Sequence, residues 1–400
     1  MALLLLLIIY MAFISLGLPD SLLGAGWPVM QNDMHQSLDS AGILYMIIAS
    51  GTILSSLASG YLNRILGNGK ITVLSVLLTA VALWGYAMSP SMLWLIICSV
   101  PLGLGAGAVD ATLNNVVALH YKAHHMSWLH CFWGIGATIS PFIMSYSIAN
   151  QGSWREGYFN IAIIQFMLTG ILILSLPLWS RLQGTKSVSA MSTKEIASDI
   201  TNCPTTRPLQ MKGVKIGLLS FFFYCGVEAM MGLWGSSYLV NTKGLSVSTA
   251  AQWVSLFYGG LTVGRFLSGF MALKLSNRFM IRYGQITAVV GTVALVLPLP
   301  TVFSLIGFIL IGLGLAPIYP CMLHETPVRF GRTHSQSIMG IQMAVAYTGT
   351  TFLPPLLGLL ASQYSTGIFP YAILLSAGIL LLSSELLNWI LSNRSKEITL

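Results

Sequence analysis

Charge is what this sequence has least of. Only 8% of its 400 residues are charged, whereas 55% are hydrophobic. A soluble domain carries about 25% charged residues, because it must hydrate its surface. The composition therefore excludes an ordinary water-facing shell, and we expect lipid to solvate most of the surface.

Paired cysteines and phosphate-binding loops are also missing. No CxxC spacing occurs among the five cysteines, which argues against a disulfide framework or a zinc site. The nearest string to a phosphate loop, Gly184-Thr185-Lys186-Ser187, lacks the glycine that must precede the lysine. We therefore expect no cofactor, no metal and no nucleotide-driven step. Any transport would use an ion gradient or the gradient of the solute itself.

The formal net charge of +8 does not indicate a nucleic-acid partner. The basic residues are scattered in short loops between apolar runs and do not form one continuous face. Basic loops of this kind are ordinary on the cytoplasmic side of a membrane protein.

Long apolar runs are what the sequence does contain. About 20 residues cross a bilayer core, and runs of that length predict twelve membrane helices in an all-α protein. The opening segment continues apolar beyond the length of a signal peptide and lacks a basic start, so we interpret it as the first span. The predicted spans are 3–28, 41–62, 71–89, 92–119, 127–149, 157–179, 214–240, 248–272, 279–298, 301–322, 336–362 and 366–392.

Lysine and arginine in the loops predict the orientation. Sixteen fall in loops on one side of the predicted spans, whereas Arg155 and Lys243 alone fall on the other. The positive-inside rule then places both termini in the cytoplasm, and we expect a multi-pass protein of a bacterial inner membrane that acts as a monomer. The polar stretch 180–213 is interpreted as a cytoplasmic linker between bundles at 1–179 and 214–400.

The two predicted halves repeat each other. Gly51, Gly60, Gly103 and Gly105 recur 209 residues later, at Gly260, Gly269, Gly312 and Gly314. Gly136 and Pro141 recur 213 residues later, at Gly349 and Pro354. Duplicated six-helix halves around a site at mid-membrane are typical of secondary transporters. Most of these glycines are expected to serve close helix packing.

Ionisable residues inside the predicted spans are the candidate functional groups, because a charge there costs a few kcal/mol. Asp20 follows Pro19, which removes a backbone donor and loosens the first helix, as in the broken helices of transporters. Asp110 and Asn114 are four residues apart and share one helical face. Desolvation of the Asp110 carboxyl disfavours its charged form, which is what proton loading and release require. A structural, hydrogen-bonded carboxyl is the alternative for both acids.

Glu228 lies 208 residues after Asp20 and so holds nearly the same place in the repeat. Trp234 and Tyr238 follow it on the same predicted helix. Their rings suit stacking against a sugar, although interfacial aromatic residues would look the same.

Three further polar groups in the spans have structural interpretations first. Arg265 is predicted to form an ion pair, to reach the interface, or to act in gating. Glu385 is expected to be structural. His130 could join a proton relay, but a hydrogen-bonded structural histidine is the simpler interpretation.

With these residues in view, the chain resembles the major facilitator superfamily. That fold has twelve spans in two pseudo-symmetric six-helix bundles. The superfamily's signature between spans two and three is degraded here, where Ser59, Asn63-Arg64 and Gly67 occupy its places.

Several strings are more similar to the fucose–proton symporter family. They are Asp20-Ser21-Leu22-Leu23, Asp110 with Asn114, GRFLSG from Gly264 to Gly269, and APIYP from Ala316 to Pro320. The resemblance implies proton coupling and sugar binding at Asp20 and Asp110. One position departs from it, since Trp133 stands where that family has asparagine, so a fucose pocket is not implied.

The sequence therefore predicts a proton-coupled symporter, not an enzyme, for a sugar or similar polar solute. Asp110 is the predicted proton carrier, and Asp20 or Glu228 a second coupling group. Residues expected to line the cavity are Asn114, Trp133, Trp234, Tyr238, Tyr319 and Gln342. A drug/proton antiporter and a sodium-coupled sugar carrier are the alternatives on the same scaffold. A membrane sensor that does not transport is the alternative from another class, and the two-half plan disfavours it.

Overall fold

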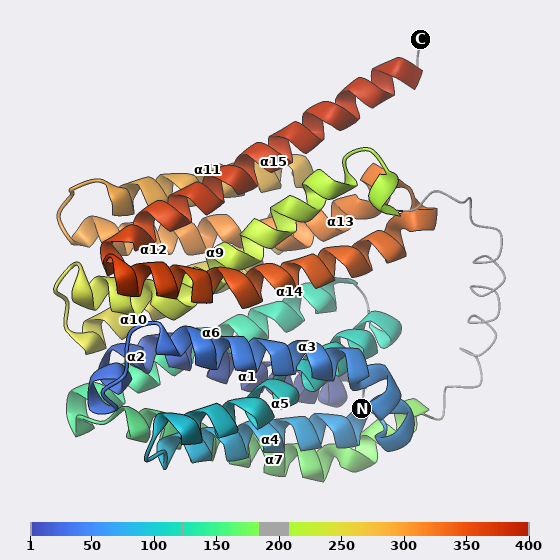
Figure 1. Cartoon of the computed structure of the whole chain (residues 1–400). Helices are drawn as coiled ribbons and strands as arrows, with labels where there is room; N and C mark the ends of the chain where they lie inside the picture. The colour runs from blue at the N-terminus through green and yellow to red at the C-terminus, as the bar shows by residue number, and fades with distance from the viewer. Residues whose placement is uncertain (1, 122, 184–207, 399–400) are drawn as a thin grey trace.

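The computed structural model describes residues 2–121, 123–183 and 208–398. Within these ranges the chain is helical, with short connections and no strands. Figure 1 shows two bundles lying side by side, the N half (α1 to α7) and the C half (α9 to α15). The predicted all-α architecture with two six-span halves is confirmed.

The N half accounts for the first six predicted spans. Its helices are α1 (Ala2–Asp20), α2 (Leu22–Asp33), α3 (Ser40–Leu66), α4 (Asn68–Ala87), α5 (Met92–His120), α6 (Ala123–Gln151) and α7 (Trp154–Gln183). Span one is α1 and α2 together, interrupted at Ser21.

The C half accounts for the other six. After a short 3-10 turn (η1, Pro208–Gln210), it contains α9 (Val214–Asn241), α10 (Val247–Met271), α11 (Asn277–Val296), α12 (Val302–Leu315), α13 (Ile318–Phe330), α14 (Arg332–Gln363) and α15 (Phe369–Ile398), with a second turn, η2 (Thr366–Ile368), before α15. Most of the predicted linker lies outside the described residues.

Eleven segments of the described chain are long and apolar enough to cross a membrane. The twelfth span, α10, has the length but carries Gln252 and Arg265 among many small residues, which lowers its hydropathy. It packs between the two halves, against α6 and α12 as well as α9, and Arg265 lies on the protein-facing side, while Val263, Phe266 and Phe270 are exposed. A charged residue is tolerated in a membrane helix where it faces protein.

Two proline bends in the N half are stabilised by side chains from neighbouring helices. Pro19 cannot donate to the carbonyl of Ser15, and Gln165 of α7 donates to that carbonyl instead (2.6 Å). Pro141 in α6 likewise leaves the carbonyl of Ala137 free, and the hydroxyl of Ser21 donates to it (2.8 Å). Both bends thus occur without an unpaired buried carbonyl.

The helix breaks do not occur at equivalent positions in the two halves of the sequence repeat. Span seven, the counterpart of span one, is the continuous helix α9. Span ten, by contrast, is divided between α12 and α13 at Ala316 and Pro317, whereas its counterpart α5 is unbroken. Span ten was predicted as one helix ending near 322. The structure corrects this, because the chain bends at Pro317 and then continues to Phe330.

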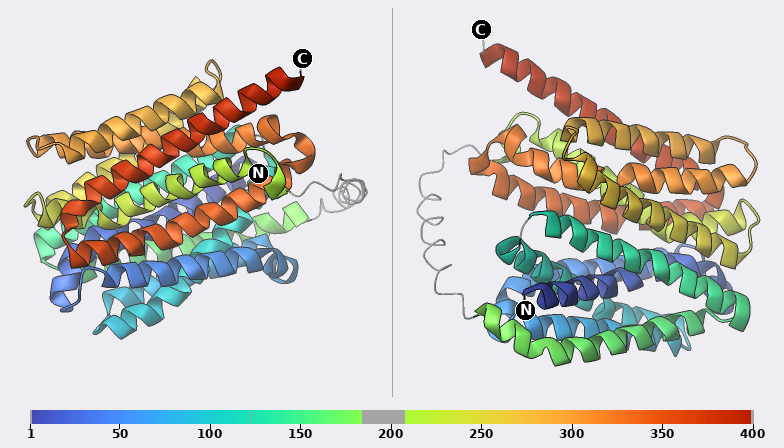
Figure 2. Two further views of the ribbon diagram at one scale, coloured as in Figure 1. Left: turned by 45° about the horizontal axis from the view of Figure 1, so that its top comes forward. Right: turned by 180° about the vertical axis from the view of Figure 1, so that it is seen from behind.

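Both chain termini, and the residues on either side of the 184–207 connection, lie at one end of the bundle, which we call the linker end (Figure 2). The same end holds Arg64 in the last turn of α3, Lys70 in the first turn of α4 and Lys274 in the loop after α10. The other end, which we call the far end, holds Arg155 in the first turn of α7 and Lys243 in the loop after α9. The structure therefore sorts the basic residues by end as predicted.

The halves pack tightly against each other at the far end. A Cβ added to Gly24 of α2 would collide with the backbone of Gly232 and Leu233 in α9. Gly42 of α3 similarly faces Pro355 of α14, where a Cβ would lie 3.0 Å from the proline Cα. The hydroxyl of Ser145 donates to the carbonyl of Ser248 across the same boundary (2.8 Å). The far end is thus closed by backbone-to-backbone contact.

A methyl group at Gly24 is expected to open the far end, because backbone atoms cannot move aside for it. In Gly24→Ala, spin labels at positions 37 and 241, one on each half, should show a new population at longer distance in pulsed dipolar spectroscopy. Gly378→Ala is the matched control, since a Cβ there meets nothing within 4 Å. Unchanged distances in Gly24→Ala would contradict this description of the closure.

Candidate functional site

A cavity of about 1440 Å³ lies between the two halves. Its lining begins in mid-bundle with Asp20, Tyr45 and Tyr258 and continues to the linker end, to residues such as Tyr121 and Val328. Residues of the far-end closure do not line it. The protein is therefore in a state open toward the linker end and closed at the far end.

Asp20 lies at the bend between α1 and α2, and its carboxyl is exposed to the cavity. The indole Nε1–H of Trp133, on α6, donates to its Oδ2 at 2.7 Å. The bend at Pro19 ends α1 at this residue, so the local sequence itself presents the carboxyl to the cavity. The donor is neutral, so protonation of Asp20 would leave no buried cation unpaired.

Asp110 lines the same cavity from α5. Asn114, one turn further along, donates to its Oδ1 at 2.8 Å, as their spacing predicts. Tyr347 of α14 donates to its Oδ2 at 3.3 Å, so a C-half hydroxyl reaches an N-half carboxylate. Both partners are again neutral donors.

Glu228 differs from the two aspartates because it forms an ion pair. Its Oε2 lies 3.4 Å from a guanidinium nitrogen of Arg265 and accepts a 2.7 Å hydrogen bond from Tyr224. The pair joins α9 to α10 within the C half, and both side chains are less than one-fifth exposed. The guanidinium carbon of Arg265 also lies 5.1 Å from the ring centre of Trp133. Arg265 thus forms an ion pair and does not extend to the interface, and the pair is compatible with both a structural and a gating role.

Aromatic rings form much of the remaining wall. Tyr319 packs against Phe221 and Tyr224, with ring centres 5.7 and 5.5 Å away, and its hydroxyl donates to the sulfur of Met343. His130 lines the cavity with its ring edge-on to Phe13. Such surfaces suit the apolar face of a ring-shaped solute.

Four residues expected to line the cavity do not line it. Asn114 donates to Asp110, which lines the cavity, but is not itself part of the lining. Trp234 is buried in the far-end core, where its indole donates to the carbonyl of Pro354 at 2.7 Å. Tyr238, one turn further along α9, stacks on Phe369. Gln342 is buried and accepts a hydrogen bond from Thr326. The expectation for these four is corrected. Trp234 and Tyr238 lie past mid-bundle on α9, where the far end is closed, and Gln342 of α14 packs against α13 inside the C half.

Sequence reasoning did not find Tyr45, Tyr258 or Tyr347, which also line the cavity. A tyrosine in an apolar run carries no signal of where it points. Glu325 was missed for another reason, since it was assigned to the loop after span ten. The sequence clue was the pair Glu325 and Arg329, whose i, i+4 spacing predicts an ion pair on a helix.

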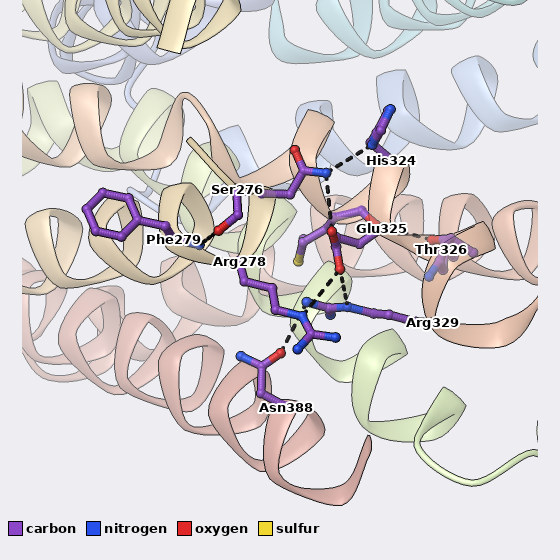
Figure 3. A network of polar contacts seen from close by, with 11 residues as sticks. Ser276, Arg278, Phe279, His324, Glu325, Thr326, Arg329 and Asn388 are labelled. Carbon is purple, nitrogen blue, oxygen red and sulfur yellow. Dashed lines mark hydrogen bonds and ion pairs between the residues drawn. The ribbon is translucent and has the colours of Figure 1, made fainter. Parts of the chain in front are cut away.

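Glu325 is the centre of a polar network at the linker end of the C half (Figure 3). Arg329 donates to its carboxylate at 3.2 Å, and Arg278 lies 3.7 Å away. Arg329 also donates to Asn388 of α15 at 3.2 Å. This network ties α11, α13 and α15 together within one half.

Glu385 accepts two hydrogen bonds from Arg282, at 2.7 and 2.5 Å, and joins α15 to α11. This geometry matches its expected structural role. Among the residues that the structure describes, no cluster of histidine, cysteine, aspartate and glutamate could hold a metal ion.

Two six-helix bundles around a central cavity that contains ionisable side chains and is open at one end define a membrane transporter. The Major Facilitator Superfamily model matches residues 5–331 and 216–398, so the chain belongs to that family. Its members are transporters and not enzymes.

Individual relatives are distant. The chain is 24% identical over 386 residues to "Bypass of stop codon protein 6" of Saccharomyces cerevisiae, covering 90% of this chain and 77% of the yeast protein. It is 23% identical over 319 residues to the glucose/mannose transporter GlcP of Bacillus subtilis, covering 78% and 77%. The inward open conformation of the xylose transporter XylE from E. coli superimposes with a TM-score of 0.76 at 12% identity, covering 98% and 96%.

Removing the cation of the cavity's ion pair should destabilise the protein. Arg265→Gln leaves Glu228 in a largely buried place without its guanidinium, which costs about 3 kcal/mol. The thermal unfolding midpoint in detergent is therefore expected to fall. Adding Glu228→Gln should restore much of it.

The matched control is Arg282→Gln, because its pair with Glu385 is half exposed and worth little. An equal loss in the control, or no recovery in the double variant, would show that the buried pair is not the cause.

Proposed function

We propose that the protein is a proton-coupled symporter for a sugar or a similar small, uncharged polar solute, working by alternating access. The observation that carries the proposal is the contrast among the cavity's acids. Asp20 and Asp110 are held by neutral donors, whereas Glu228 is held by a guanidinium. A carboxyl without a buried cation can take up and release a proton without leaving a charge uncompensated.

Asp110 is the proposed proton carrier, and Asp20 is favoured over Glu228 as the second coupling group. With Asn114 and Tyr347 as its donors, Asp110 is reached from both halves. Its protonation would weaken the bond from Tyr347, because charge-assisted hydrogen bonds are roughly twice as strong as neutral ones. Proton binding would then loosen a contact between the halves, which is the step that alternating access requires.

The charges in the cavity support an uncharged solute. In mid-bundle the cavity lining has three carboxyls against one guanidinium, whereas a fourth carboxyl, that of Glu325, lies at the linker end beside two arginines. An anion would therefore meet repulsion in mid-bundle unless both aspartates were protonated. Hydroxyl groups of a sugar can donate to these carboxyls, and the rings of Trp133 and Tyr319 offer stacking surfaces. The names of GlcP and the xylose transporter are consistent with this class of solute.

The same excess of carboxyls favours a second candidate, a drug/proton antiporter. A lipophilic cation would be attracted by Asp20 and Asp110 and would compete with protons for them. Sodium-coupled sugar transport is the third candidate. The orientation is part of the proposal as well: the basic linker end faces the cytoplasm of a bacterial inner membrane, so the cavity is open inward in a monomer.

The test uses purified protein in liposomes with an entrapped pH dye and a panel of monosaccharides added outside. Addition of the transported sugar should acidify the lumen, and Asp110→Asn should abolish this signal and all accumulation while sparing counterflow exchange. Asp39→Asn, at the far end, is the matched control. Full accumulation by Asp110→Asn would exclude Asp110 as the carrier.

Two further arms separate the alternatives. Replacing sodium by choline should leave the signal unchanged if protons are the coupling ion. No pH signal with any sugar, together with proton release on addition of lipophilic cations, would establish the antiporter instead.

A further inference from the structure

Trp133 touches both halves of the protein with different parts of one ring. Its N–H donates to the carboxylate of Asp20 in the N half at 2.7 Å, and its face lies against the guanidinium of Arg265 in the C half, 5.1 Å from the ring centre. Arg265 in turn pairs with Glu228 at 3.4 Å. A continuous chain of contacts therefore runs from Asp20 to Glu228 across the cavity.

The ring is held in this orientation from two sides. Gly17 of α1 packs directly on the backbone of Trp133, and a side chain there would collide with its carbonyl. Tyr258 of α10 meets the indole edge-on, with ring centres 6.2 Å apart. The indole can thus keep its edge on Asp20 and its face on Arg265 at the same time.

We propose that Trp133 is a positioning residue that makes the protonation of Asp20 depend on the Arg265–Glu228 ion pair in the other half. A cation over the face of an indole attracts its π-electrons, which makes the N–H a better donor. A better donor stabilises the carboxylate form of Asp20. The carboxylate in turn fixes the ring beneath Arg265.

The protonation state of Asp20 and the position of Arg265 over the ring affect each other, because thermodynamic coupling is reciprocal. A solute that binds Arg265 or Glu228 would draw the guanidinium from the ring and weaken the N–H bond to Asp20, which favours protonation. Protonation of Asp20 would release the ring and free the ion pair for the solute. Trp133 would thereby make proton binding and solute binding favour each other, as symport requires.

Other titratable and charged groups line the cavity around Asp20, from each of the elements that surround it. They are Tyr45 of α3, Asp110 of α5, His130 of α6, Glu228 of α9, and Tyr258 and Arg265 of α10. The experiment must therefore separate the path through Trp133 from direct effects of these charges.

Infrared pH titration of the protein in lipid detects protonated carboxyls directly, and the component that Asp20→Asn removes belongs to Asp20. In Trp133→Phe, which keeps an aromatic face but loses the donor, its titration midpoint should rise by about one pH unit. Trp133→Gln, which keeps an N–H donor, should stay near the parent. Trp234→Phe is the matched control, because Trp234 donates to a backbone carbonyl outside the cavity.

A double substitution, Arg265→Gln with Glu228→Gln, tests the connection between the halves. It exchanges a neutral pair for a neutral pair, so the net charge of the cavity is kept. The Asp20 midpoint should rise when Trp133 is present and should not rise further in Trp133→Phe. Equal rises in both backgrounds would mean that the pair acts without Trp133 and would overturn the proposal.

The inference rests on the proposed function in treating Asp20 as a proton site, but the titration needs no solute, so the two can fail separately. An Asp20 midpoint that Trp133→Phe leaves unchanged overturns the inference alone. Absence of any titrating component that Asp20→Asn removes overturns Asp20 as a proton site, and the inference with it. Failure of sugar-driven acidification, with the infrared shifts as expected, would reject only the solute class.

Discussion

A carboxylate in the middle of an apolar bundle needs partners, and the kind of partner decides what it can do. A guanidinium compensates the negative charge of Glu228, and removing either partner would leave the other uncompensated in a largely buried place. Indole, amide and phenol groups, which are neutral, hold Asp20 and Asp110. The three acids in the middle of the cavity thus differ in their partners, which are a cation for one of them and neutral donors for the other two. The difference follows from ordinary hydrogen-bond chemistry in a medium of low polarity.

The need of a buried charge for a partner also explains which contacts join the two halves. Within the described residues, the far-end contacts between halves are glycine-to-backbone packing and hydroxyl-to-carbonyl hydrogen bonds, with the ion pairs kept inside single halves. Separating the halves there would not require any ion pair to be broken in lipid. Glycines such as Gly24 permit the close approach that closes this end without side-chain interlocking. Charge therefore stabilises each half, and shape controls their association.

The sequence was sufficient for the architecture, because a run of about 20 apolar residues leaves few alternatives in a membrane. Asp20, Asp110 and Glu228 could also be found, since ionisable residues are conspicuous in apolar runs. The sequence could not show in which direction a side chain points or how far along the bundle it lies. Trp234 and Tyr238 share a helix with Glu228, yet they lie in the closed core, whereas Tyr347 reaches Asp110 from 237 residues away. Those relations depend on how the halves pack, which no local pattern encodes.

The proline bends tie together positions that are far apart in the chain. Gln165 is needed at its place because Pro19 leaves a carbonyl of α1 without a donor, and Ser21 serves the carbonyl that Pro141 leaves in α6. Each donor also has a second partner, the hydroxyl of Ser15 for Gln165 and that of Ser140 for Ser21. A lineage that lost Gln165 before Pro19 would carry an unpaired carbonyl until the proline was replaced. The bends at the cavity should therefore be inherited as linked pairs of residues, which change together or remain together.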